Sequence, residues 1–290
     1  MTMKKIKAGR QPNRSLAGDI GVGIVLVLFG CFFAFPLVYV INSAFKPLDE
    51  LFVFPPRLFV RNPTTKNISD MFLLMNKQGV ITFTRYAFNS LLITVVGTAG
   101  HILIASMAAY VLAKYRFPGS LTFFKMVTVA LMFTGYVLAI PNYLIMARLG
   151  WVNTYLALII PAFASPMGLF LMKQFMESSI PDVLVEAAKI DGAREGRIFF
   201  TIVMPLVKPA ILTLMIFSIQ GLWNNVGTTY IYSEELKTLP FALRTLAAGG
   251  VARTGVSSAS TLFMMILPVV CFILAQSNIV ETMASSGIKE

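Results

Sequence analysis

Residues 186–205 form the longest region between two apolar segments in which charges of both signs return every few residues. Glu186 opens this region, and a carboxylate there can accept hydrogen bonds from a basic group of another protein or form an ion pair with it. Asp191 and Arg194 flank Gly192 and could brace a turn, although an exposed ion pair adds little stability. These residue types, at this spacing, support recognition of a partner protein.

The segment before this region has the features of a helix start. Ser178 and Ser179 are candidate N-caps, Pro181 fits a first helical turn, and Asp182 is favourable at the positive end of the helix dipole. Apolar side chains then line one flank, so we expect a short amphipathic helix over residues 182–190.

Gly192 supplies the stop of this helix, because glycine takes a positive φ without a clash at Cβ. A side chain at this position is also expected to fill the space between the first helix and a second one over residues 193–201. Ala187 and Ala188 would keep the docking face thin, and Pro205 marks entry to the next apolar segment. A helix–glycine–helix elbow with a half-apolar face, placed at a membrane surface, is suited to docking.

The spacing of these residues resembles the EAA loop of ATP-binding-cassette importer permeases. Glu186-Ala187-Ala188 is followed after three residues by Gly192, and after nine more by Ile202-Val203-Met204-Pro205. The family pattern ends Ile-x-Leu-Pro, so Met204 departs from it while keeping a similar size and polarity. The resemblance implies that the loop 178–205 is a cytoplasmic coupling helix seated in a cleft of a partner ATPase; for this motif alone, the competing interpretation is an ordinary interfacial amphipathic helix. The implied coupling residues are Glu186, Ala187, Ala188, Asp191, Gly192, Arg194 and Pro205.

The composition is that of a polytopic membrane protein, with 57% hydrophobic and 13% charged residues. The net charge of +11 does not indicate nucleic acid, because the basic residues are scattered among the N-terminus and the loops. Cys31 and Cys271 both fall inside apolar segments, so we expect neither a disulfide nor thiol chemistry. Because the chain has no metal-binding motif and no GxxxxGK[ST] phosphate loop, we expect it to bind no cofactor, with ATP and magnesium on partner ATPase subunits.

The apolar runs predict an all-α fold with six transmembrane helices. A basic tail, 1–18, precedes them and is expected in the cytoplasm by the positive-inside rule. The first run is too long for a signal peptide and lacks a cleavage site, so we expect a retained helix. A short tail, 281–290, is expected on the same side of a bacterial cell membrane. The six expected spans are 19–45, 88–112, 121–147 with an interruption at Pro141, 154–176, 206–223 and 258–280.

A candidate substrate contact lies at the outer end of the expected fifth span. Trp223, Asn224 and Asn225 resemble the Trp-Asn stretch of this helix in the family. Trp223 could stack on a sugar face while one of the amides bonds hydroxyl groups. The alternative is a tryptophan of the interfacial belt followed by amides that end the helix, and the sequence favours neither.

His101 is the only histidine and lies near the middle of the second expected span. An ionisable group at that depth is a candidate for function. No acidic or basic residue lies near it in the same span to form a proton relay, so a neutral ring packed between helices beside Gly97 and Gly100 is favoured.

The chain is similar over nearly its whole length to the maltose-type permeases of the sugar and oligosaccharide branch. That resemblance implies a transport subunit rather than an enzyme, working by alternating access with a second homologous permease, two ATPases and an extracytoplasmic solute-binding protein. Glycerophosphodiesters, polyols and oligouronides are alternative solutes. A stand-alone secondary transporter is the less favoured alternative, because acidic residues are absent from the interior of all six spans and no internal repeat is found.

Overall fold

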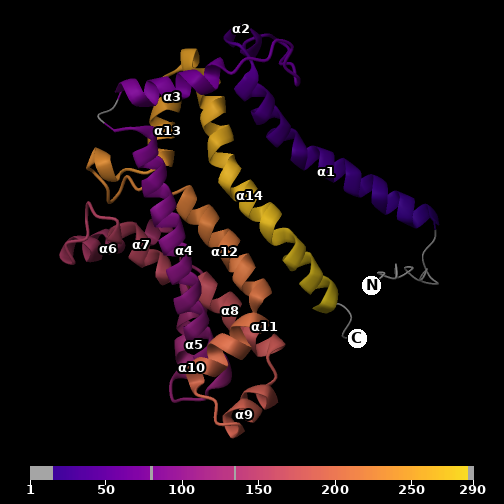
Figure 1. Cartoon of the computed structure of the whole chain (residues 1–290), viewed down its shortest axis with the longest axis vertical. Coiled ribbons are helices and arrows are strands. Elements are labelled where there is room, and N and C mark those ends of the chain that lie inside the picture. The colour runs from indigo at the N-terminus through magenta and orange to yellow at the C-terminus, as the bar shows by residue number, and fades with distance from the viewer. Residues whose placement is uncertain (1–15, 79–80, 134, 287–290) are drawn as a thin grey trace.

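The computed structural model describes residues 16–78, 81–133 and 135–286, and this part of the chain is helical without any strand. The molecule is elongated (Figure 1). Helix α9 (Asp182–Ile190) lies at one end of the long axis, and α2 (Leu48–Leu51) and α3 (Lys66–Gln78) lie at the other. Residues 1–15 of the expected N-terminal tail 1–18, with all of its basic residues, lie outside the described residues, as do residues 287–290 of the expected C-terminal tail.

Helix α4 (Phe83–Lys114) is the central element and runs along the long axis. It packs most extensively against α7 (Leu156–Phe163), α8 (Pro166–Ser179) and α12 (Lys208–Trp223). Glycines permit this close approach, because a Cβ built on Gly97 would lie only 2.6 Å from a methyl carbon of Leu222 in α12. Small residues at helix contacts are the usual means by which apolar helices pack in membranes.

Four described segments are long and apolar enough to cross a membrane. A fifth candidate is a pair of helices, Glu195–Leu206 and Lys208–Trp223, which are bent by 79° relative to each other. This bend explains why the expected fifth span, 206–223, is short. The four single segments are Gly18–Phe45, Phe83–Lys114, Leu156–Ser179 and Val251–Gln276.

The segment expected as a third span, 121–147, is not one helix. It is divided into α5 (Ser120–Ala130) and α6 (Gly135–Arg148), and α6 extends to the left of α4 in Figure 1. The 11 residues of α5 cover only about 16 Å, against a hydrocarbon core of about 30 Å. The expected interruption at Pro141 is wrong, because that residue lies inside α6 and the break precedes it.

Helix α1 (Leu16–Phe45) diverges from the rest of the molecule, as Figure 1 shows. It packs chiefly against α14 (Thr254–Ser286) and α3, and none of its most apolar window is buried. Helix α14 continues beyond the expected end of the sixth span, so the first six residues of the expected tail 281–290 are helical. Helix α13 (Leu239–Ala247) packs between α14 and the N-terminal part of α4.

Candidate functional site

The chain between α8 and α12 forms an elbow of two short helices. Helix α9 spans Asp182–Ile190, the backbone turns at Gly192 with φ of 78°, and α10 spans Glu195–Ile198. A π-helical turn, Phe199–Val203, and α11 (Met204–Leu206) then lead to α12. The expected helix over 182–190 and the positive φ expected at Gly192 are confirmed.

Three local expectations for the elbow are wrong. Ser178 and Ser179 belong to the last turn of α8, and Pro181 is the N-cap of α9, without a side-chain capping bond. A Cβ at Gly192 would meet no atom within 4 Å, so its requirement is conformational and not one of space. The second helix begins at Glu195, two residues later than the expected start at 193, because the chain first turns back through an extended residue at Arg194. It then continues past the expected end at 201, through the π-helical turn to Leu206.

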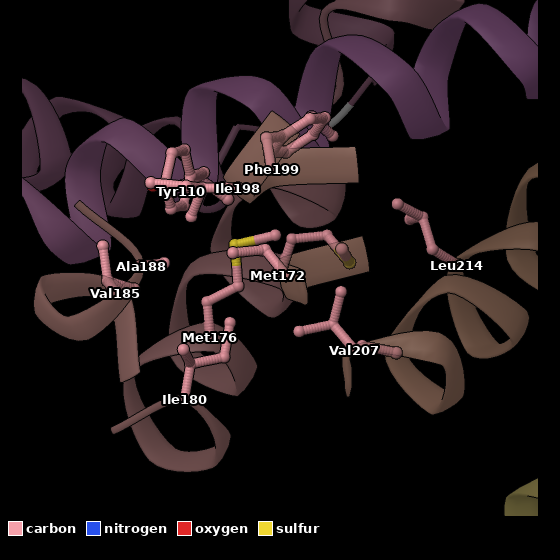
Figure 2. Packing of buried hydrophobic residues seen from close by; sticks show 14 residues of the cluster. Tyr110, Met172, Met176, Ile180, Val185, Ala188, Ile198, Phe199, Val207 and Leu214 are labelled. Carbon is pink, nitrogen blue, oxygen red and sulfur yellow. The ribbon is translucent and has the colours of Figure 1, made fainter. Parts of the chain in front are cut away.

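The inner face of α9 attaches the elbow to the rest of the chain. Val185 and Ala188 are buried in a cluster with Met172 and Met176 of α8 and with Phe199 (Figure 2). Burying a valine side chain such as that of Val185 is worth about 1.5–3 kcal/mol relative to exposing it. Ala188 therefore packs inward, contrary to its expected place on the docking face.

The outer face of α9 remains open. Val183 is 73% exposed and Ile190 is 86% exposed. Glu186 and Ala187 lie between them at helical spacing and are also exposed. This face combines apolar side chains with one carboxylate and points away from the helical core, so it can receive a partner protein.

The turn of the elbow is braced by residues other than the expected pair. Within the described chain, no ion pair joins Asp191 to Arg194, and both side chains are exposed. Lys189 Nζ instead lies 3.1 Å from a carboxylate oxygen of Glu195 and so connects α9 to α10. The other oxygen of Glu195 accepts hydrogen bonds from the hydroxyls of Tyr110, at 3.2 Å, and Tyr115.

Lys114, the last residue of α4, holds the start of α9. Its side chain is only 4% exposed, and its ammonium group lies 2.7 Å from Asp182 Oδ1 and donates to the carbonyl oxygen of Ile180. The hydrogen bond from Lys114 holds the pKa of Asp182 below its usual value. Sequence reasoning missed this contact, because nothing in the local pattern shows that the end of α4 meets the start of α9.

Pro205 lies exposed in α11, just before the bend into α12. Proline suits this position, since the first turn of a helix leaves its N–H groups without partners inside the helix. The position agrees with the expected entry to an apolar segment.

The expected substrate contacts at 223–225 occupy structural roles. Trp223 is only 8% exposed and donates its indole N–H to the carbonyl oxygen of Met264 in α14, at 3.0 Å. Its ring is therefore placed neither to stack on a sugar nor to lie in an interfacial belt. The side-chain amide of Asn224 donates a hydrogen bond to the carbonyl oxygen of Gln220. The side-chain oxygen of Asn225 accepts one from the backbone N–H of Gly227, in a turn.

His101 packs between helices, as expected. Its ring is 5% exposed, and Nδ1 lies 3.1 Å from Ser218 Oγ of α12. The ring faces α8 so closely that a Cβ on Gly168 would lie 2.1 Å from Nε2.

Comparison with known proteins establishes the family. The family model described as the inner membrane component of binding-protein-dependent transport systems matches residues 101–284, more than half of the chain. The chain belongs to this family. It is therefore a membrane-spanning permease of an ATP-binding-cassette importer, a transport component and not an enzyme.

Two relatives and one solved structure show the extent of the similarity. The permease is 29% identical to the arabinooligosaccharides transport system permease protein AraQ of Halalkalibacterium halodurans, over 97% of this chain and 99% of that protein. It is 30% identical to the sn-glycerol-3-phosphate transport system permease protein UgpE of Pectobacterium atrosepticum, over 91% and 93% of the two chains. A bacterial transporter involved in the import of the acidic polysaccharide alginate contains a chain of the same fold, with a TM-score of 0.75, 21% identity, and coverage of 92% of this chain and 99% of that one.

Proposed function

We propose that this permease imports a sugar or oligosaccharide delivered by an extracytoplasmic solute-binding protein, through alternating access powered by two partner ATPases. The outward face of α9 is the observation that carries the proposal. Val183 and Ile190 are exposed there, whereas Val185 and Ala188 are buried against the membrane helices. A partner bound to this face therefore moves the elbow and the helices beneath it as one body.

Each coupling residue has a role consistent with its position. Glu186 pairs with a basic group of the ATPase, and Ala187 allows the ATPase to approach closely. Asp191 and Arg194, exposed on either side of the turn, contact the same partner rather than each other. Gly192 sets the angle between the two arms of the elbow.

The proposed topology has six spans with both termini in the cytoplasm. The end that carries α9 is cytoplasmic, and the end that carries α3 and α13 is extracytoplasmic. Helices α5 and α6 together form a broken third crossing. The bent pair of helices Glu195–Leu206 and Lys208–Trp223 forms the fifth. We place ATP and magnesium on the ATPases and propose a second, related permease as the partner within the membrane.

The solute class is proposed from the relatives. Their names specify arabinooligosaccharides, sn-glycerol-3-phosphate and alginate, which are polar and rich in hydroxyl groups. Glycerophosphodiesters and polyols are the alternatives. A screen of the purified binding protein against oligosaccharides, sn-glycerol-3-phosphate and polyols tests this choice, and retention of no carbohydrate would contradict it.

Co-purification tests the coupling role of α9. The tagged wild-type chain should retain an ATPase that carries a phosphate-binding loop when it is isolated from its host membrane. Val183→Glu should lose this ATPase, because a charge then replaces an apolar contact. Val251→Glu is the matched control, since Val251 is 70% exposed and lies in the turn between α13 and α14. The start of α14 contacts α3, at the opposite end of the molecule from α9. Equal retention of the ATPase by Val183→Glu and the wild type would refute the assignment.

A further inference from the structure

The carboxylate of Glu195 joins three helical segments at the inner end of α4. One oxygen pairs with Lys189 of α9 at 3.1 Å, and the other accepts from Tyr110 and Tyr115. Lys189 Nζ also lies 4.4 Å from the centroid of the Tyr115 ring. Charge-assisted hydrogen bonds of this kind are stronger than neutral ones. We refer to Tyr115, Glu195 and Lys189 as the inner node.

The inner node is one of two polar attachments that the described residues show between α9 and the end of α4. Lys114 holds the first residue of α9, Asp182, at 2.7 Å, whereas the inner node holds its last turn through Lys189. Between these points, Val185 and Ala188 are buried. A displacement of α9 that preserves these contacts therefore also moves the end of α4.

The outer end of α4 carries the same chemistry. Tyr86, in the first turn of α4, donates to Glu234 Oε1 at 2.7 Å, and Glu234 Oε2 lies 2.6 Å from Lys237 Nζ. We refer to Tyr86, Glu234 and Lys237 as the outer node. One turn along α4, Asn89 donates to the carbonyl oxygens of Glu235, at 2.8 Å, and Lys237, at 2.9 Å. The loop between α12 and α13 is thus fixed to α4.

The helix between the two nodes is suited to carrying a displacement. It has 32 residues, about 48 Å at 1.5 Å per residue, and contains no proline at which it would kink. It is packed along its length by α7, α8, α12 and α13.

We propose that α4 is a rod that carries the displacement of the α9 elbow to the outer loop 233–238, with Glu195 and Glu234 as positioning residues at its two ends. The inference rests on the proposed docking of an ATPase on α9. Because coupling between two binding sites is reciprocal, a solute-binding protein that contacts the outer loop also shifts the equilibrium position of the α9 elbow and its bound ATPase through the same rod. The rate of ATP hydrolysis serves as the readout of that shift.

The test uses the complete complex, with both permeases and the ATPases, reconstituted in liposomes. ATP hydrolysis is measured with and without the solute-binding protein, purified with the solute that it retains. Glu195→Gln removes the carboxylate charge of the inner node, and Glu234→Gln removes that of the outer node. We expect each variant to reduce the stimulation of hydrolysis by the binding protein about fivefold or more. A factor of about five corresponds to the lower end of typical coupling free energies between two sites. The double variant should lose no more of this stimulation than either single variant, because the loss of one node already disconnects α4 from the elbow or from the outer loop.

Glu177→Gln is the matched control. It removes the Lys173–Glu177 ion pair of α8, at 2.6 Å, and Glu177 forms no hydrogen bond or ion pair with the residues of either node, so stimulation should match the wild type. If Glu195→Gln does not assemble, Tyr115→Phe, which removes a single hydroxyl, carries the same expectation with a smaller loss. Wild-type stimulation in both single variants, or losses that multiply in the double variant, would overturn the rod. A wild-type complex that contains no ATPase would overturn the proposed function itself.

Discussion

At the residue scale, the elbow depends on one backbone conformation. Gly192 has φ of 78° and open space where a Cβ would stand, so strain alone disfavours a side chain there. A residue with a Cβ in the left-handed region costs about 1–2 kcal/mol. The angle between α9 and α10 is therefore set by a local property of the chain.

We expect Gly192→Ala to lower the free energy of unfolding by about 1–2 kcal/mol, measured by thermal unfolding of the purified complex. Gly196→Ala is the matched control. Gly196 also has no atom within 4 Å of its Cβ position, but it lies in α10 without a positive φ, so alanine should be neutral or slightly stabilising there. Equal effects of the two substitutions would show that backbone strain at Gly192 is not the cause.

Glu50 is a second residue whose role is local, at the end of the molecule that carries α2 and α3. Its two carboxylate oxygens accept the backbone N–H groups of Arg61, at 3.0 Å, and Asn62, at 2.9 Å. The hydrogen bond from Arg61 is the main cause that holds the pKa of Glu50 below its usual value, while burial opposes it. The ionised carboxylate thereby closes the loop that follows α2.

The hydrogen bonds of the Glu50 carboxylate make the loop that follows α2 sensitive to acid. Because the folded-state pKa is depressed, the stabilisation is present above the unfolded pKa of about 4.3 and is lost as the pH falls through the folded-state pKa. Glu50→Gln should therefore unfold at a lower temperature than the wild type at neutral pH. The gap should begin to narrow below about pH 4.3 and close as the pH falls through the folded-state pKa. Asp49→Asn, at an exposed neighbouring carboxylate, should show no such gap. A gap for Glu50→Gln that does not change with pH would contradict the assignment.

At the element scale, the contact between α4 and α8 requires glycine opposite histidine. A Cβ on Gly168 would lie 2.1 Å from His101 Nε2, and the ring is also held by Ser218. The distance between these helices is therefore set by the absence of one methyl group.

Gly168→Ala should destabilise the permease by about 1–3 kcal/mol through overpacking. Adding His101→Ala should recover much of this loss, because the ring that meets the new methyl group is removed. Gly221→Ala in α12 is the control, since its Cβ would meet no atom within 4 Å. Thermal unfolding of the wild type, Gly168→Ala, His101→Ala and the double variant measures the coupling between the two residues. Additive losses in the double variant would show that the two residues do not meet.

At the scale of the whole molecule, the chain exposes far more surface than a compact soluble protein. Its accessible area is 19,170 Å², whereas a compact monomer of 31.9 kDa exposes roughly 12,000 Å². Exposed apolar side chains lie on several helices and follow one another closely along α1, where Phe32 is 71% exposed. Lipid and other subunits are needed to cover these side chains.

We expect the chain to be stable in detergent only when its partner subunits are expressed with it. Size-exclusion chromatography of the chain expressed alone should show a larger aggregated fraction than that of the co-expressed complex. Removal of α1 should reduce this difference, because α1 contributes a large unpartnered apolar surface. A monodisperse, thermally stable chain in the absence of partners would contradict the expectation.

The sequence by itself determined what depends on neighbouring residues. The apolar runs predicted an all-helical membrane protein, and the EAA spacing predicted the family, both of which are confirmed. The bounds of α9 and the positive φ of Gly192 also followed, because helix periodicity and backbone sterics act within a few residues.

Only the tertiary structure decided which distant residues meet. Lys114 and Asp182 are 68 positions apart, and Tyr115 and Glu195 are 80 apart, so no local pattern indicates their contact. Trp223 resembled a ligand-stacking residue by its position at a helix end, yet the packing of α14 buries it. Likewise, the run 121–147 is apolar enough for a span but is divided between α5 and α6. Hydropathy measures the affinity of a segment for lipid or core, whereas contacts and helix breaks are decided by how helices pack once the chain has folded.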